Sequence, residues 1–148
     1  MKQLSYLQQQ QREFFLSGKT RKLSFRQEAL KKLSECVIRR KTEILDALHT
    51  DLNKSATEGE MTEISVLQEE IRYVSKHLRK WSKPLNVKTP LVLFPARSYR
   101  IAEPYGVVLI MSPWNYPLLL SLEPLVGAIA AGNCAVIKPS AYSPATSS

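Results

Sequence analysis

Two short segments of the sequence carry polar side chains that could do chemistry. Asn115 lies within the run Pro113–Pro117, and Lys138 begins a run that ends at Ser140. An asparagine amide can donate an N–H to a developing oxyanion without adding net charge, as the tetrahedral intermediate of an acyl transfer requires. A lysine can hydrogen-bond a ribose hydroxyl or meet a phosphate. Lys138 is the only basic residue after Arg100, and this isolation favours a specific role over a solvated charge.

Both segments follow stretches that are typical of buried parallel strands. The first stretch is the continuous apolar run from Val107 to Met111, and the second is Cys134 to Ile137. The intervening residues, Leu118 to Ala131, predict a helix that is interrupted or kinked by Pro124 and stopped by Gly132. This order predicts a βαβ unit, the start of a doubly wound sheet. Ligands of such sheets bind beyond the carboxyl ends of the strands, so both polar segments are expected to face one crevice.

The residues alone leave a plainer interpretation open. Pro113–Pro117 could be a rigid turn with Trp114 packed beneath it, and Lys138 could be a surface residue after a strand. No GxGxxG fingerprint follows the strand Val107–Met111, and the next glycines come too late to cradle a pyrophosphate at the first turn. Taken alone, these residues predict a βαβ unit with a crevice and do not fix a reaction.

The beginning of the chain is predicted to be helical. Apolar residues fall on one side of a helix over Gln3–Ser17, with Gly18 as its C-terminal cap. Ser24–Gln27 has the form of a capping box, and apolar positions continue at helical spacing from Phe25 to Ile38. A break is expected near Arg40.

The next two helices are predicted on either side of a loop. Thr42–Leu52 repeats the helical pattern, Asn53–Ser55 is the predicted loop, and Glu58–Trp81 is the most strongly periodic segment. Lys83-Pro84 should end this last helix. Its apolar positions, separated by three or four residues, are Met61, Ile64, Leu67, Ile71, Val74, Leu78 and Trp81.

A proline-rich stretch separates the helical part from the predicted βαβ unit. Val87, Leu91–Phe94 and Tyr99–Ile101 predict short extended segments at a sheet edge. The chain is therefore divided into helical residues 1–82, extended residues 83–104 of an edge or oligomerisation type, and residues 105–148.

Several ordered segments together resemble the aldehyde dehydrogenase family. Phe14–Thr20 and Asp51–Ser55 also resemble the helical start of its class 3 branch, so the resemblance covers essentially the whole chain. It implies an α/β fold in which amino-terminal helices precede the first βαβ unit of a doubly wound, Rossmann-like cofactor domain, here truncated. The segments that carry the resemblance to the family are Gly106–Ile110, Pro113–Pro117, Gly127–Asn133 and Val136–Ser140.

The resemblance implies NAD or NADP as cofactor and assigns site residues. Asn115 would be the oxyanion-hole amide, and Lys138 would contact the adenosine ribose. Ala141 stands where the family commonly has an acid, and the missing carboxylate would remove repulsion toward a 2′-phosphate, so the choice between NAD and NADP stays open. The residues implied to bind the cofactor are Met111, Ser112, Pro113, Trp114, Lys138 and Ser140.

The implied reaction is oxidation of an aldehyde to a carboxylic acid. In the family a Cys thiolate adds to the carbonyl, hydride passes to nicotinamide, and water activated by a Glu hydrolyses the thioester. That Cys and Glu are expected beyond Ser148, so the chain alone is expected to be inactive, and a homodimer is implied for the full-length protein. Cys134 begins a predicted buried strand and cannot replace the nucleophile. Solvated or packed roles are expected for Glu123, His49 and His77.

The charge distribution and the cysteine spacing limit the classes of partner and the cellular compartment expected for the protein. Residues 1–100 hold 20 lysines and arginines and 11 acids, interleaved at helical spacing, which favours a solvated helix face over a nucleic-acid site. Cys36 and Cys134 show no metal or disulfide spacing, and neither a signal peptide nor a membrane-spanning stretch is evident, so a cytoplasmic protein is expected. The alternative function is a non-enzymatic helical interaction module whose basic face binds an acidic partner.

Overall fold

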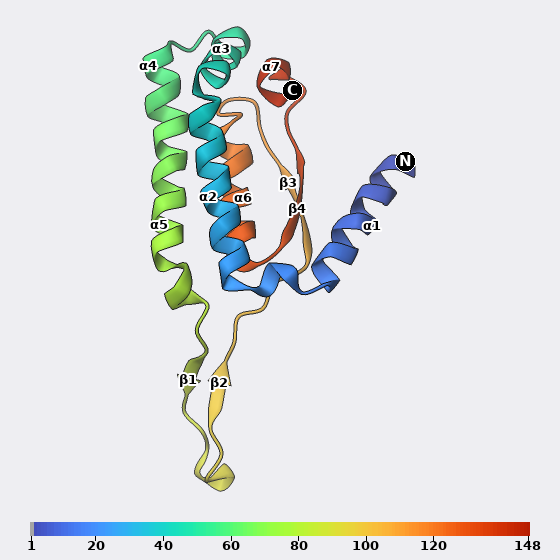
Figure 1. The fold of residues 1–148 in the computed structure, drawn as a ribbon, viewed down its shortest axis with the longest axis vertical. Helices are drawn as coiled ribbons and strands as arrows, with labels where there is room; N and C mark the ends of the chain where they lie inside the picture. Colours follow the sequence, from blue (N-terminus) through green and yellow to red (C-terminus); the bar gives the residue numbers. More distant parts are fainter. Residues whose placement is uncertain (1) are drawn as a thin grey trace.

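A two-stranded parallel sheet is packed beside a layer of helices in the computed structural model, which describes residues 2–148 (Figure 1). Residue 1 of the predicted helical range 1–82 lies outside the described residues. Strand β3 (Val107–Met111) pairs in parallel with β4 (Cys134–Lys138), and α6 (Leu119–Ala131) connects them. The predicted βαβ unit is therefore confirmed. A final short helix, α7 (Pro144–Ser147), follows β4.

The predicted helices of the first part are present. Gly18 follows α1 with a φ of 72°, the left-handed conformation expected of a terminating glycine. Arg40 separates α2 from α3, as predicted. The elements are α1 (Lys2–Leu16), the 3-10 turn η1 (Lys19–Arg21), α2 (Leu23–Arg39), α3 (Lys41–Leu52), α4 (Ala56–Gly59), η2 (Glu60–Ile64) and α5 (Ser65–Trp81).

The predicted capping box at Ser24–Gln27 is wrong. Helix α2 begins at Leu23, Lys22 is its N-cap, and no side chain caps it. The amide N–H of Arg26 already donates to the carbonyl oxygen of Lys22, so Ser24 lies inside the first turn and not before it. The apolar spacing was read correctly in the middle of the helix, whereas Phe25 and Ile38 near its ends are exposed.

The main core lies where α2, α5 and α6 meet. Leu67 and Val126 are fully buried there, one on α5 and one on α6. Burial of apolar side chains at this junction holds the helical layer against the βαβ unit. The buried residues of the cluster are Leu30, Val37, Ile64, Leu67, Ile71, Val74, Leu78, Leu118, Val126 and Ala130.

The long helix predicted over Glu58–Trp81 is interrupted by a turn of π-helix, η2. One extra residue per turn rotates the preceding residues by about 100° relative to α5. Met61, predicted on the buried face, is therefore 66% exposed, while Glu63 is 0% exposed. Trp81, at the other end of the predicted face, is also exposed. The apolar positions between Ile64 and Leu78 are buried as predicted.

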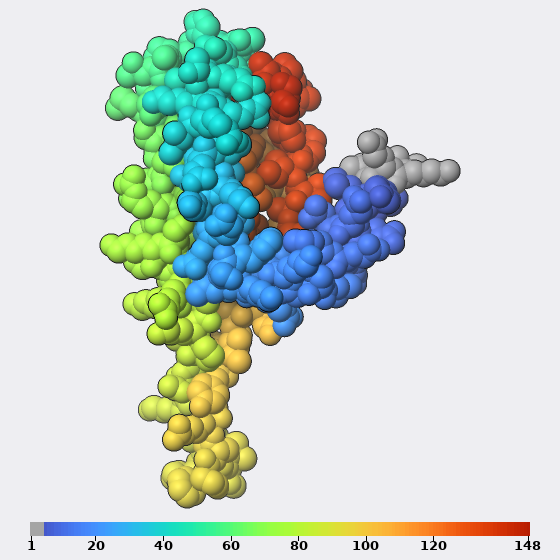
Figure 2. Space-filling model, viewed as in Figure 1, coloured from blue at the N-terminus to red at the C-terminus, as the bar shows by residue number. Residues whose placement is uncertain are grey.

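The proline-rich stretch forms a hairpin that projects from one end of the molecule (Figures 1 and 2). Strand β1 (Leu85–Val87) pairs antiparallel with β2 (Ser98–Arg100) in a sheet separate from β3 and β4. Val87 and Tyr99–Arg100 thus lie in short extended strands, as predicted. Leu91–Leu93 is the 3-10 turn η3 and not extended, because its carbonyls and amides bond locally, as in Phe94 N–H to Leu91 O.

Two further expectations for the βαβ unit need correction. Leu109 and Met111 are 61% and 72% exposed, so β3 is not covered on both faces by the described residues. Helix α6 is not interrupted at Pro124, because a proline removes only one hydrogen-bond donor while the buried residues after it keep the helix packed; a kink there stays a prediction. Gly132 ends α6 with a φ of 87°, as predicted.

Candidate functional site

The two segments predicted to carry chemistry adjoin at the carboxyl ends of the parallel strands. Met111 is paired with Lys138 in the β3–β4 register, and the amide N–H of Ser112 donates to the carbonyl oxygen of Lys138 at 3.2 Å. The loop that carries Asn115 thus begins directly beside the end of β4. The parallel pairing is what brings together residues that are more than twenty positions apart in the chain.

The side chains at this edge are open to solvent. Asn115 and Lys138 are both exposed, and Trp114 is 53% exposed. The interpretation in which Trp114 packs beneath a rigid turn is therefore wrong. Within residues 2–148, the Asn115 amide has no hydrogen-bond partner and the Lys138 ammonium has no ion-pair partner. Both groups are available to a ligand.

The two serines predicted to bind cofactor are buried and already bonded within the chain. The hydroxyls of Ser112 and Ser121 share a hydrogen bond of 2.7 Å. The hydroxyl of Ser140 accepts from the amide N–H of Tyr142 at 3.1 Å. These bonds hold the ends of the two strands in place, and the predicted cofactor contacts of both serines stay predictions. Pro113 is exposed beside them.

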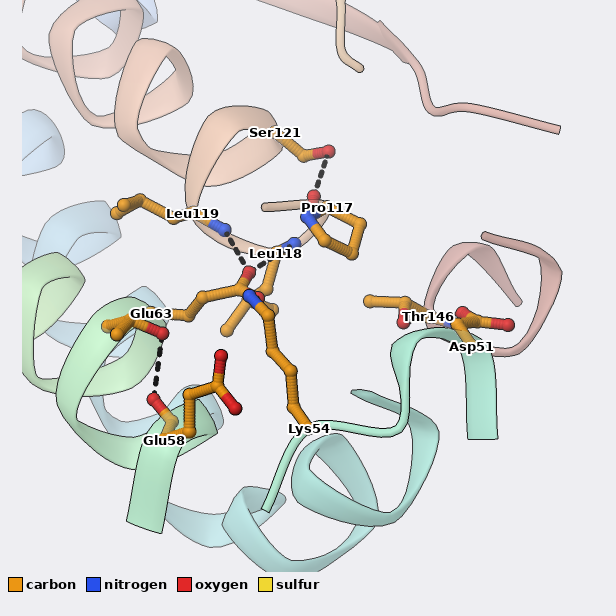
Figure 3. Close-up of polar contacts among 10 residues, drawn as sticks. Asp51, Lys54, Glu58, Glu63, Pro117, Leu118, Leu119, Ser121 and Thr146 are labelled. Atoms are coloured by element: carbon orange, nitrogen blue, oxygen red, sulfur yellow. Dashed lines mark hydrogen bonds and ion pairs between the residues drawn. The ribbon is translucent and has the colours of Figure 1, made fainter. Parts of the chain in front are cut away.

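A buried ion pair that the sequence reasoning missed holds the far end of the Asn115 loop (Figure 3). Lys54 Nζ lies 2.6 Å from Glu63 Oε1, and the two side chains are 8% and 0% exposed. Glu63 Oε2 accepts from the amides of Leu118 and Leu119 at 2.9 and 3.1 Å. The position of Glu63, four residues before the buried Leu67, was a signal that could have identified it.

A second carboxylate fixes the end of the described chain. Asp51 on α3 accepts from the amide N–H of Ala145 at 3.0 Å and from both the amide and the hydroxyl of Thr146 at 2.7 Å. Burial alone would raise the pKa of Asp51, but these hydrogen bonds outweigh it and lower the pKa. Asp51 therefore ties α7 to α3.

A pocket of about 490 Å³ lies next to the two polar segments, in the recess between α2, α3 and the last residues of the chain (Figure 2). Pro117 and Pro139, one from each segment, line it. It is lined largely by apolar side chains, including Val37, Ile44 and Leu122. Asn115 and Lys138 do not line it. We place the candidate site at the strand ends and not in this pocket, because the polar groups able to do chemistry gather at the strand ends.

The remaining candidate nucleophiles and bases of the chain, which are one cysteine, two histidines and one glutamate, have local partners or are at least half-buried. Cys134 is 6% exposed, and burial raises the pKa of its thiol, which disfavours the reactive thiolate. His49 Nδ1 lies 3.1 Å from the carbonyl oxygen of Lys54, and the His77 ring stacks on Trp81. Glu123 is half-buried in α6.

The basic helices carry paired charges on their exposed faces. Lys31 pairs with Glu35 and Lys32 with Glu28, each across one turn of α2. This pairing supports the interpretation of a solvated helix face. Among residues 2–148 the structure places no group of three metal-ligating side chains together, and no helix is both long and apolar enough to span a membrane.

Comparisons with known proteins identify relatives along nearly the whole chain. The sequence model of the Aldehyde dehydrogenase family matches residues 7–148. The 4,4'-diaponeurosporen-aldehyde dehydrogenase of Staphylococcus aureus is 51% identical over 131 residues, covering 88% of this chain and 28% of the relative. Aldehyde dehydrogenase family 3 member B1 of Bos taurus is 50% identical over 135 residues, covering 91% and 29%.

Solved structures have the same fold. A substrate-bound structure of Staphylococcus aureus AldH, 49% identical, superimposes with a TM-score of 0.89 over 92% of this chain and 30% of that one. Succinic semialdehyde dehydrogenase from Streptococcus pyogenes in complex with NADP+, 17% identical, has a TM-score of 0.84 over 97% and 30%, and shows the fold alone. The chain thus spans about 30% of the length of the relatives it matches. The family match and these relatives show that the chain belongs to the aldehyde dehydrogenase family, and its relatives include members of family 3.

Proposed function

We propose that the complete protein oxidises an aldehyde to a carboxylic acid with NAD or NADP, and that this chain forms its first helices and the start of its cofactor domain. One observation carries the proposal. The exposed Asn115 lies on the loop after β3, and that loop begins next to Lys138 at the end of β4. The uncharged amide of Asn115 can stabilise the oxyanion of an acyl-transfer reaction, and the isolated cation of Lys138 can contact a dinucleotide bound at the same edge.

Asn115 is proposed to donate its side-chain N–H to the oxyanion that forms when a nucleophile adds to the aldehyde carbonyl. Its amide is exposed and has no hydrogen-bond partner among residues 2–148, so the donor is free to meet a reacting group. The bonds of Ser112 and Glu63 hold the two ends of its loop. A donor held in position before the reaction stabilises the developing charge without reorganising.

The donor set at the strand ends fits a dinucleotide. Lys138 offers an ammonium that no carboxylate of the described residues neutralises, and Met111 and Trp114 offer exposed apolar surface. We assign Lys138 to the adenosine ribose and the two apolar side chains, together with Pro113, to the walls of the cleft. The nicotinamide of the bound cofactor supplies the hydride acceptor. Ala141 is exposed and brings no carboxylate, which supports access for NADP as well as NAD.

We place the nucleophilic Cys and the general-base Glu of the reaction outside residues 2–148. Cys134 is buried in β4 with a raised thiol pKa, and Glu123 lies half-buried in the middle of α6. Neither has the exposed, activating surroundings that a nucleophile or base requires. The chain is therefore proposed to be inactive by itself.

The projecting hairpin supports a homodimer for the complete protein. Leu85 and Tyr99 are each 51% exposed on its paired strands, and Leu91 at its tip is 91% exposed. Exposed apolar side chains gathered on a hairpin favour burial against another chain. The two free cysteines, Cys36 and Cys134, are compatible with the reducing environment of the cytoplasm, where we propose that the protein acts.

The proposed function is tested by turnover. The purified complete protein should form NADH or NADPH when an aldehyde is added, whereas residues 1–148 alone should not. A complete protein that binds neither cofactor nor aldehyde contradicts the proposal, as does turnover by the chain alone that is lost in Cys134→Ala. The helical interaction module is the weaker candidate, because Lys31 and Lys32 on its basic face are paired with acids of the same helix.

A further inference from the structure

We propose that Glu63 and Lys54 are positioning residues for Asn115, an inference that rests on the oxyanion role proposed above. The pair lies between the helical layer and the end of the loop that carries Asn115 (Figure 3). Neither residue reaches the exposed amide itself. They act through the loop, by fixing the residues that follow Asn115.

The first contact is between the Glu63 carboxylate and the start of α6. Leu118 is the N-cap of this helix and provides no capping side chain. The amides of Leu118 and Leu119 lie in the first turn, where helix N–H groups have no partner within the helix. Glu63 Oε2 accepts from both, at 2.9 and 3.1 Å. A side chain more than fifty residues away therefore completes the cap.

The second contact fixes the carboxylate itself. Glu63 is 0% exposed, and a buried carboxylate needs a compensating charge as well as hydrogen bonds. Lys54 Nζ supplies both at 2.6 Å from Glu63 Oε1, and the positive end of the α6 dipole adds to the stabilisation. With both oxygens occupied, the carboxylate can hold only one orientation toward Leu118.

The third contact reaches the loop next to Asn115. The Lys54 ammonium lies 4.0 Å from the centroid of the Tyr116 ring, a cation–π distance. Tyr116 is the residue directly after Asn115, and its carbonyl oxygen accepts from the amide N–H of Leu120 in α6. The pair therefore fixes the residue beside Asn115 as well as the start of the helix.

The opposite end of the loop is fixed independently. Ser112 is bonded through its amide to Lys138 and through its hydroxyl to Ser121. The Asn115 amide has no partner of its own among the described residues, so its position depends on these two ends. Loss of the Glu63 contact would free one end while the other end stays in place.

The test uses Glu63→Gln in the complete enzyme, which keeps the shape of the side chain and removes its charge. Glu60→Gln is the matched control, because Glu60 lies on the same π-helical turn and pairs with Lys41 away from the loop. Tyr116→Leu is the second variant, because Tyr116 is 39% exposed and its replacement should leave the fold intact. Each variant is also combined with Asn115→Ala.

In single-turnover experiments, we expect Glu63→Gln to slow the chemical step by up to about 10²-fold, the scale of a misplaced catalytic group. Tyr116→Leu should slow it less, and Glu60→Gln should leave it unchanged. The dissociation constant of the cofactor should stay the same in all three. In the Asn115→Ala background, neither Glu63→Gln nor Tyr116→Leu should slow the step further, because a positioning residue has nothing left to position.

The outcomes separate this inference from the proposed function. If Asn115→Ala alone leaves the chemical step unchanged, the oxyanion role fails and the inference fails with it. If Asn115→Ala slows the step but folded Glu63→Gln and Tyr116→Leu do not, only the positioning role is overturned. Full additivity with Asn115→Ala also overturns it. Should Glu63→Gln not fold, Tyr116→Leu and its double variant decide the question alone.

Discussion

The amide N–H of Ser112 donates to the carbonyl oxygen of Lys138 at 3.2 Å, which joins the two polar segments of the site directly. The bond continues the parallel ladder one step beyond the pair formed by Met111 and Lys138. Because of this, the loop that carries Asn115 leaves the sheet beside Lys138. Asn115, the proposed oxyanion donor, and Lys138, the proposed ribose contact, are therefore both positioned by the paired ends of β3 and β4.

Replacement of Asn115 by Ala in the complete enzyme should lower kcat by about 10²-fold or more, the usual effect of removing one oxyanion-hole donor. Folding should be unaffected, because the side chain is exposed and unbonded within residues 2–148. Asn86→Ala on the projecting hairpin makes the same chemical change away from the site and should be silent. An unchanged rate, measured where the chemical step limits turnover, would remove Asn115 from the mechanism.

Replacement of Ala141 by Glu should shift cofactor preference toward NAD. A carboxylate within about 6 Å of a 2′-phosphate opposes it by more than 1.4 kcal/mol in a partly solvated site. The ratio of kcat/KM for NADP to that for NAD should therefore fall by at least about tenfold. Ala141→Gln, similar in size and uncharged, is the control. Equal ratios in the Glu and Gln variants would show that no phosphate approaches this position.

Two glycines of the α6 region should respond oppositely to replacement by alanine. Gly132 has a φ of 87°, and an added Cβ would lie 3.1 Å from the carbonyl oxygen of Thr20, so Gly132→Ala should destabilise by about 1–2 kcal/mol. Gly127 is helical with nothing within 4 Å, so Gly127→Ala should stabilise by up to about 1 kcal/mol. The first thermal transition of the complete protein reports both. Shifts of the same sign would contradict the assigned backbone conformations.

The bonds of Asp51 predict a pH-dependent attachment of α7. The hydrogen bonds lower the folded-state pKa of Asp51 below its unfolded value, which is about 3.9 for an aspartate. Its contribution is therefore fully present above the unfolded pKa and is lost as the pH falls through the folded pKa. Hydrogen-exchange protection of the Ala145 and Thr146 amides should be weaker in Asp51→Asn at pH 6, and the two proteins should converge in acid. A difference that persisted in acid, where the carboxylate is protonated, would rule out this carboxylate as the cause.

The chain of residues 1–148 by itself should associate. Leu109 and Met111 are exposed on one face of β3, and the hairpin exposes Leu91 at its tip. Exposed apolar side chains next to unpaired strand edges favour contacts between molecules. Analytical ultracentrifugation should show a mass that rises with concentration, with helical circular dichroism retained. A monomer with a sharp two-state thermal transition at low micromolar concentration would contradict this expectation.

The sequence by itself determined the elements whose signals are local. The periodicity from Ile64 to Leu78 and the terminating glycines Gly18 and Gly132 are confirmed. The apolar runs of β3 and β4 are confirmed as parallel strands, though not as strands covered on both faces. The spacing of apolar residues and the backbone preferences of glycine act over one or two helical turns, so neighbouring residues suffice to predict these helices, helix ends and strands.

Only the tertiary structure decided which residues meet across the chain. The π-helical turn leaves Met61 exposed although its local spacing predicts burial, and the backbone partners of the buried Glu63 come from the start of α6 and not from its own helix. The predicted capping box at Ser24–Gln27 is wrong for a local reason. The carbonyl oxygen of Lys22 already accepts the first helical hydrogen bond of α2, from the amide N–H of Arg26. The bond between Glu63 and Leu118 joins residues 55 positions apart, and its stability comes from burial that exists only after the helices have packed.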